Sequence, residues 1–280
     1  MKKVVVISII IGTALFIFCK KSPQTTKVQP PNETAVSLLD TTHILAYGYP
    51  AYSDTVLDQT YFIIAYNRNL KIPEWVAYYL TKESLTGTTP RSDDFRPDPE
   101  LPADKQASLA DYERSGYDRG HMAPAAAFKQ NRKAMSTTFL LTNMTPQTPQ
   151  INRYGWKDLE EDERKLLDEY QEIWVITGCT LLDSTMKRIS PQEYIGNLVY
   201  IPTHFYKAIL AKRINGIFDA FAFIIPNQKT LLAHPVYYYS ITADSLETLT
   251  GLDFFNILDD TIETAIEAKK PLLRYMEDRN

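Results

Sequence analysis

Cysteine is scarce in this chain, which has only Cys19 and Cys179 among its 280 residues. Two cysteines cannot supply the disulfide framework of a small secreted domain, and neither has a partner at metal-ligand spacing. Cys19 lies in the N-terminal leader. Cys179 follows an apolar segment and Gly178, so we expect it to be a buried small residue without chemistry.

Histidine is also scarce, and the motifs of two hydrolase classes are missing. The chain has four histidines and no H-E-x-x-H, which leaves a zinc hydrolase without a ligand set. It has no G-x-S-x-G, so a Ser-His-Asp esterase lacks its nucleophile elbow. His43 and His234 stand in no motif, and the apolar and aromatic neighbours of His204 predict a structural residue in a core strand. His121 is the histidine that stands in a polar motif.

The chain lacks the basic excess that usually accompanies phosphate binding, because its formal net charge is −4 at pH 7. A catalytic site, however, needs positive charge locally and not over the whole chain. Residues 118–133 carry four basic side chains against one carboxylate. Net charge therefore does not exclude a nucleic-acid substrate, although it predicts weaker binding than that of a strongly basic protein.

One long apolar run occurs, from Val4 to Phe18, after a basic start and directly before Cys19. About fifteen apolar residues make a secretory signal and are short for a membrane span. We therefore expect residues 1–19 to be a signal peptide that resembles the bacterial lipoprotein type, with Cys19 lipidated. The protein would then be exported, periplasmic or held by its lipid at the outer membrane or cell surface. Phe18 departs from that pattern, since a small residue is expected there, so ordinary secretion and an uncleaved anchor stay open.

The rest of the chain is predicted to be a flexible linker, residues 20–42, and a single domain, residues 43–280. The linker contains Pro23, Pro30 and Pro31 among polar residues. Apolar runs predict strands at 61–66, 75–80, 137–141, 173–177, 205–211 and 220–225. Helical patterns span 152–172, 245–252 and 262–276, and residues 83–116 form a long irregular connection. Because strands and helices are mixed without a regular βαβ rhythm, the fold class is α+β.

The most informative segment is Asp118-Arg119-Gly120-His121, which is followed by Asn143 and Asn152. Histidine exchanges a proton near neutral pH, and a carboxamide oxygen is a hard ligand suited to magnesium. A base beside a sparsely liganded metal fits phosphodiester hydrolysis. Four-residue spacing also places Asn152, Trp156 and Glu160 on one helical face, although by itself this stripe is more typical of a solvated helix face.

These motifs together resemble the DNA/RNA non-specific endonucleases of the ββα-metal superfamily, of the endonuclease G-like type. The matching residues are Asp118-Arg119-Gly120-His121-Met122-Ala123-Pro124, Thr142-Asn143-Met144-Thr145-Pro146-Gln147, and Asn152 with Trp156, Leu159 and Glu160. The resemblance covers roughly residues 45–256. It implies a ββα-metal nuclease fold, with a central, mostly antiparallel sheet flanked by helices.

The resemblance also implies a role for each matching residue. His121 would be the general base that activates water, and Asn152 would be the one direct protein ligand of Mg²⁺, with Mn²⁺ as a substitute. Asn143 would orient His121 or its surroundings, and Glu160 would hold a metal-bound water.

The resemblance also implies that Arg91 would stabilise the charge that develops on the phosphate, with Arg119 also near the site. Arg96 competes with Arg91 because the spacing in that irregular segment is loose.

By resemblance, the function is metal-dependent endonucleolytic cleavage of DNA and RNA to 5′-phosphate ends. Because such an enzyme reads backbone phosphates and not base edges, little sequence preference is expected. The alternative is a catalytically weak nucleic-acid-binding protein on the same scaffold. A homodimer stays open, since some relatives in that family are dimers, and a membrane is a further partner if Cys19 carries lipid.

Overall fold

The computed structural model describes residues 44–270, which belong to one compact unit. The predicted signal peptide, the linker, Cys19 and His43 lie outside the described residues, as does the last part of the predicted C-terminal helix. The strands are β1 Val56–Asp58, β2 Ile63–Asn67, β3 Ile72–Thr81, β4 Asp118–His121, β5 Met144–Gln147, β6 Glu172–Thr180, β7 Tyr194–Ile195, β8 Val199–Tyr200, β9 His204–Lys212, β10 Phe218–Pro226 and β11 Ser240–Ile241. The α-helices are α1 Leu109–Tyr112, α2 Arg132–Thr137, α3 Trp156–Lys165, α4 Ala243–Thr250 and α5 Asp260–Glu267.

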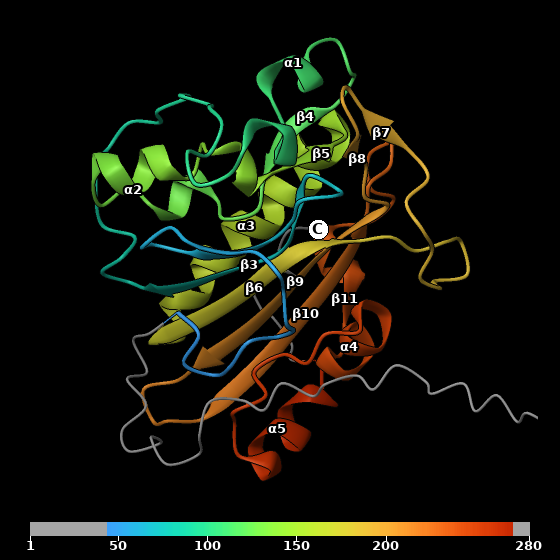
Figure 1. Cartoon of the computed structure of the whole chain (residues 1–280). Helices are drawn as coiled ribbons and strands as arrows, with labels where there is room; N and C mark the ends of the chain where they lie inside the picture. Colours follow the sequence, from blue (N-terminus) through green and yellow to red (C-terminus); the bar gives the residue numbers. More distant parts are fainter. Residues whose placement is uncertain (1–43, 271–280) are drawn as a thin grey trace, which may run out of the picture. The chain divides into compact units, whose positions relative to one another are not determined.

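A seven-stranded sheet in the order β1-β2-β3-β6-β9-β10-β11 forms the centre of the unit (Figure 1). Every pairing of neighbouring strands within this sheet of the described chain is antiparallel. The strands predicted at 61–66 and 75–80 are present as β2 and β3, which pair as an antiparallel hairpin with Asn67 at the turn. The predicted α+β class with a central antiparallel sheet is confirmed.

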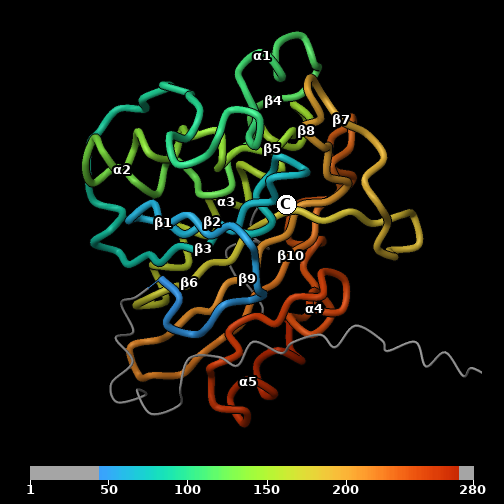
Figure 2. Tube along the Cα trace, viewed as in Figure 1, coloured from blue at the N-terminus to red at the C-terminus, as the bar shows by residue number. Residues whose placement is uncertain are grey.

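Alternating side chains give the sheet two buried faces. On β3, Val76 and Tyr78 lie in one core, and Trp75 and Ala77 lie in the other. The first core also takes up the apolar side of α3, and the second takes up α4 and α5. The tube in Figure 2 shows the same separation, with α4 and α5 away from α3. The helices therefore cover opposite faces of one sheet.

A second, two-stranded ribbon carries the polar motif of the sequence. Strand β4 pairs antiparallel with β5, and the chain then runs through a widened π-type turn, Ile151–Gly155, into α3. This ribbon and helix form the ββα unit that the motifs predicted. Gly120 is required in β4 because a Cβ there would overlap the side chain of Gln147 on the facing strand.

The predicted strand at 137–141 is wrong. Its first residue ends α2, and Leu141–Asn143 is a 3₁₀ turn before β5. Helix α2 forms because the Asn131 side chain caps it by accepting from the Ala134 N–H. Local capping therefore overrides the strand propensity of a β-branched and aromatic run.

Three further predicted elements have other boundaries, and one of them is the predicted C-terminal helix 262–276, because α5 already ends at Glu267 and residues 268–270 are not helical. The predicted helix 152–172 is regular only over α3, because a π-type turn precedes it and a 3₁₀ turn, Leu166–Asp168, follows it. Gly178 lies inside β6 and does not end the strand. The predicted helix 245–252 is confirmed as α4, which ends at Gly251 with a φ of 72°.

Among the described residues, no helix has the length and apolar character needed to cross a membrane.

Candidate active site

His121 ends strand β4 and is 8% exposed. The rings of Phe95 and Phe139 lie edge-on to the imidazole, with centroids 5.8 and 4.9 Å away. The backbone carbonyl of His121 accepts a hydrogen bond of 3.1 Å from the indole N–H of Trp156 in α3. Aromatic packing and the helix therefore fix this residue, while the ring nitrogen Nε2 has no hydrogen-bond partner among residues 44–270.

The imidazole of His121 is held in its neutral form. Burial lowers its pKa to about 3, and the positive charges of Arg91 and Arg119 act in the same direction. Its Nε2 is shielded from solvent and has no partner among the described residues. A neutral, unengaged imidazole can accept a proton, and an arriving phosphate would offset the arginine charges that oppose protonation.

Asn143 lies behind His121 and is fully buried. Its side-chain oxygen accepts from the Ala123 N–H, and its amide nitrogen donates to the carbonyls of Ala123 and Thr138. Its backbone carbonyl accepts from the Met122 N–H. Asn143 therefore braces the chain directly after His121 through backbone contacts at Met122 and Ala123, and its role in orienting the base stays a prediction.

Asn152 lies in the π-type turn before α3 and donates from its amide nitrogen to a carboxylate oxygen of Asp118, 2.9 Å away. Arg153 makes a two-pronged ion pair with the same carboxylate. Although burial acts to raise it, the hydrogen bonds from Arg153 and Asn152 hold the pKa of Asp118 below its ordinary value.

This contact fixes which way the Asn152 amide points. An ionised carboxylate only accepts hydrogen bonds, so the NH₂ group of Asn152 must face Asp118 and the carbonyl oxygen must face away. A neutral, oriented carboxamide oxygen beside a cleft suits Mg²⁺, which takes few protein ligands and keeps several waters. The donor set therefore fits the metal that the resemblance implied.

A hollow of about 340 Å³ adjoins these residues, and its lining includes Arg91, Arg119, Asp118 and Asn152. The guanidinium of Arg119 lies 4.1 Å from the centre of the Phe95 ring, and that of Arg91 lies 4.8 Å from the Phe139 ring. The two aromatic rings that hold His121 thus also support the two predicted phosphate-binding cations.

Arg96, the competitor of Arg91, turns elsewhere. Its guanidinium donates to Asp94 and to the backbone carbonyl of Ser136 at the end of α2. Arg96 is not part of the lining of the hollow. The geometry therefore favours Arg91.

Glu160 lies in α3, eight residues after Asn152. Burial raises its pKa to about 7, the charge of Lys207 opposes that rise, and the charge of Glu163 adds to it. The charge of Arg91 also lowers the pKa of Glu160, as it does that of His121. The role of Glu160 in holding a metal-bound water stays a prediction.

A fully buried ion pair supports α3 from the sheet, and the sequence patterns did not reveal it. Lys207 on β9 pairs with Glu163 on α3, and the side chains of both have no exposed surface. The hydroxyl of Tyr78 on β3 donates to Glu163 and accepts from Lys207. Lys207 also lies 5.2 Å from the ring centre of Trp156, which in turn bonds His121.

The remaining predictions on single residues concern groups outside this site. His204 is the first residue of β9, and its imidazole Nδ1 lies 3.0 Å from the hydroxyl oxygen of the preceding residue, Thr203. The thiol of Cys179 is half-buried and donates to the Pro73 carbonyl. Neither lies with the lining of the active-site hollow.

Comparison with known proteins agrees with this geometry. The sequence model of the DNA/RNA non-specific endonuclease family matches residues 40–261. The chain is 35% identical over 223 residues to Nuclease C1 of Cunninghamella echinulata var. echinulata, which covers 77% of this chain and 88% of that protein. It is also 35% identical over 218 residues to human mitochondrial endonuclease G, which covers 76% of this chain and 73% of that protein.

A solved structure supports the same assignment. A chain of the crystal structure titled as the EndoG/EndoGI complex matches with a TM-score of 0.74 and 33% identity. The match covers 81% of this chain and 96% of that chain. On the family match, the relatives and the fold together, this chain belongs to the DNA/RNA non-specific endonuclease family and is an endonuclease.

Proposed function

We propose that this endonuclease is magnesium-dependent and hydrolyses phosphodiester bonds of both DNA and RNA to 5′-phosphate ends. The observation that carries the proposal is that Arg91, Arg119 and Asn152 line one hollow, while the two aromatic rings under those arginines, Phe95 and Phe139, also pack against His121. Each of these groups recognises or acts on a phosphate and its water, and none reads a base edge. Little sequence preference is therefore expected.

Each of these residues has one role in the proposed hydrolysis. His121 takes the proton from the water that attacks phosphorus, because its imidazole is neutral and held by packing alone. Arg91 and Arg119 bind the phosphate oxygens and stabilise the added negative charge. Asn152 would hold Mg²⁺ through its carbonyl oxygen, with Glu160 accepting from a metal-bound water. The metal, when bound, supplies Lewis-acid stabilisation of the phosphate and the leaving oxygen.

The test uses the full-length chain, purified in mild detergent because of its apolar N-terminal run. Supercoiled plasmid and total RNA are each incubated with Mg²⁺, with EDTA, and with the His121→Ala and His204→Ala proteins. We expect both substrates to be cut only with metal, with a loss of about 10²–10⁴-fold in His121→Ala and little change in the matched control His204→Ala. Products should accept a kinase-added 5′ label only after phosphatase treatment.

Full activity in His121→Ala would remove the proposed base. An absence of cleavage by the folded wild-type protein would instead favour a nucleic-acid-binding protein on this scaffold. Cleavage of only one of the two substrates would contradict the proposed activity on both DNA and RNA but would not contradict the proposed mechanism.

We also propose that the chain is exported and anchored by lipid at Cys19, on the basis of its leader alone. Expression of the full chain with a radiolabelled fatty acid should label the wild type and not Cys19→Ala. A wild-type chain that takes up no label would contradict lipidation and leave ordinary secretion or an uncleaved anchor.

A further inference from the structure

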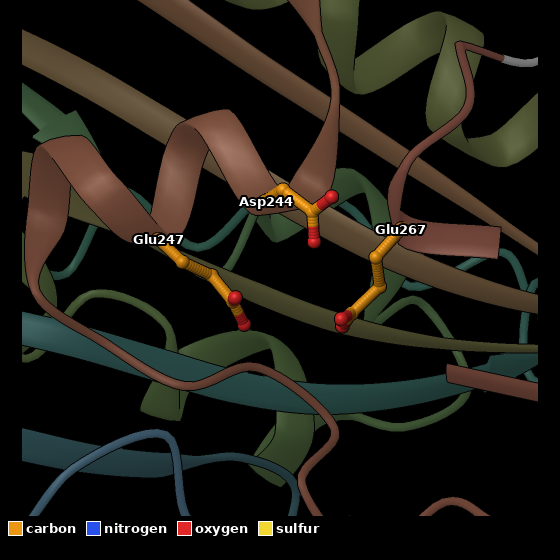
Figure 3. A group of neighbouring side chains, drawn as sticks. All are labelled: Asp244, Glu247 and Glu267. Atoms are coloured by element: carbon orange, nitrogen blue, oxygen red, sulfur yellow. The ribbon is translucent and has the colours of Figure 1, made fainter. Parts of the chain in front are cut away.

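Three carboxylates from the two C-terminal helices meet on the sheet face opposite α3. Asp244 and Glu247 come from α4, and Glu267 is the last residue of α5. One oxygen from each of the three lies within 4.8 Å of the others. Figure 3 shows the side chains of Glu247 and Glu267 directed toward the space below Asp244.

Glu267 is the most unusual member, since it is only 6% exposed. Its Oε1 is shielded from solvent and has no hydrogen-bond partner among the described residues. Ionised carboxylates are almost never buried without a partner, because their desolvation is not repaid. Within residues 44–270, no ion pair includes any of the three carboxylates, so the described part of the chain supplies no ion-pair partner there.

The electrostatics of this group are unfavourable without a cation. Burial, and next the charge of Glu247, raise the pKa of Glu267 to about 8. Burial also raises the pKa of Glu247 to about 7, although its Oε1 accepts a hydrogen bond of 2.7 Å from the Phe254 N–H. Asp253 and Glu263 face the same group and add further negative charge. A cation would offset this repulsion.

We propose that Asp244, Glu247 and Glu267 bind a calcium ion that joins α4 to α5. Calcium takes oxygen ligands at about 2.3–2.6 Å, so ligand oxygens on its opposite sides lie about 5 Å apart. The observed limit of 4.8 Å is compatible with that span. Magnesium, with ligands at about 2.0–2.1 Å, requires a tighter set. Waters and the second carboxylate oxygens would complete the coordination.

This site is separate from the catalytic one in position and in effect. Helices α4 and α5 pack on the second core of the sheet, whereas α3 and the His121 region pack on the first. The bound ion would stabilise the C-terminal helices and take no part in phosphodiester cleavage. Removing it should lower the melting temperature and leave the magnesium-dependent rate unchanged at temperatures where the protein stays folded.

The test measures calcium binding in the full-length chain carrying Asn152→Ala, which removes the proposed active-site ligand. After treatment with EDTA and its removal, the protein is titrated with CaCl₂ at pH 8.5 by isothermal calorimetry, and its Tm is measured in parallel. We expect one calcium per chain and a rise in Tm of about 5 °C at saturation. Adding Asp244→Asn, at an exposed position, should weaken calcium binding at least about tenfold, since one of three charged ligands is lost.

Two more variants distinguish calcium binding at these three carboxylates from a general effect of negative charge on α5. Glu267→Gln should abolish the calcium response and raise the Tm in EDTA, because it removes the buried charge. Asp260→Asn takes away another acid of α5 outside the triad and should keep the full calcium response. The proposal is overturned if the Asn152→Ala protein binds no calcium, or if Asp244→Asn and Glu267→Gln respond to calcium as strongly as Asp260→Asn does.

Discussion

The buried pair of Lys207 and Glu163 gives the sharpest prediction on stability. Replacing Lys207 with Met removes the ammonium group but keeps most of the unbranched side chain. Glu163 then stays fully buried on α3, where the hydroxyl of Tyr78 still donates to it but no cation faces it. A buried charge without its counter-charge costs about 3–5 kcal/mol, and we expect the free energy of unfolding to fall by that amount.

The double variant Lys207→Met/Glu163→Leu should be far less damaging than the two single changes added together. Replacing a whole buried ion pair with apolar side chains is often neutral or stabilising. One cost remains, because Tyr78 loses both partners and an unsatisfied buried hydroxyl costs about 1–3 kcal/mol. Adding Tyr78→Phe should recover most of that loss.

Urea unfolding of the full-length chain in mild detergent, followed by tryptophan fluorescence at 25 °C, measures these differences. The account predicts a coupling energy of at least about 3 kcal/mol between the two substitutions, larger than most couplings between neighbours. Additive effects of Lys207→Met and Glu163→Leu would refute the reasoning, since they would mean that the two charges do not depend on each other. The matched control is the exposed Lys82–Asp168 pair, where Lys82→Met should change stability by less than about 1 kcal/mol.

Three further predictions concern the active site. Because burial raises the pKa of Glu160 to about 7, protons compete with the metal below that pH. The apparent Mg²⁺ affinity should therefore fall by up to about tenfold for each pH unit below 7. The Glu160→Gln variant should flatten this pH profile. An unchanged slope in that variant would assign the proton elsewhere. Asn143→Ala should lower kcat at unchanged Mg²⁺ affinity, measured by titrating the rate with metal, because Asn143 braces the chain after His121; a loss of metal affinity alone would contradict this. Arg91→Ala should slow cleavage by at least about tenfold at saturating Mg²⁺ while Arg96→Ala does not, since only Arg91 lines the hollow; equal losses would contradict that choice.

The parts of the fold that the sequence predicted correctly are those governed by local pattern. The aromatic and β-branched runs at 61–66 and 75–80 form the β2–β3 hairpin, and the turn residue Asn67 lies where the strands reverse. A helix was predicted at 245–252, and α4 ends at Gly251, which takes the left-handed conformation that ends a helix. These features depend on neighbours in the chain, so a single sequence is enough to find them.

Other features depend on contacts that are distant in sequence. The π-type turn at Asn152 could not be predicted from the four-residue spacing, which assumes a regular helix from that residue onward. The buried pair of Lys207 and Glu163 could not be predicted without knowing that β9 packs against α3. The sequence nevertheless holds one sign of it. Lys207 occupies an inward position between Phe205 and Ile209, where strand alternation predicts an apolar residue. A lysine at such a position indicates a buried partner.

In the proposed mechanism, Asn152 holds the catalytic metal through its carbonyl oxygen while His121 stays metal-free. The most direct measurement is the anomalous diffraction of crystals of the protein soaked in Mn²⁺, used as a visible substitute for Mg²⁺. The account predicts a peak in the hollow at about 2.1 Å from Oδ1 of Asn152, with Asp118 still bonded to the amide nitrogen. A peak bound instead by the Asp118 carboxylate or by a His121 ring nitrogen would contradict it.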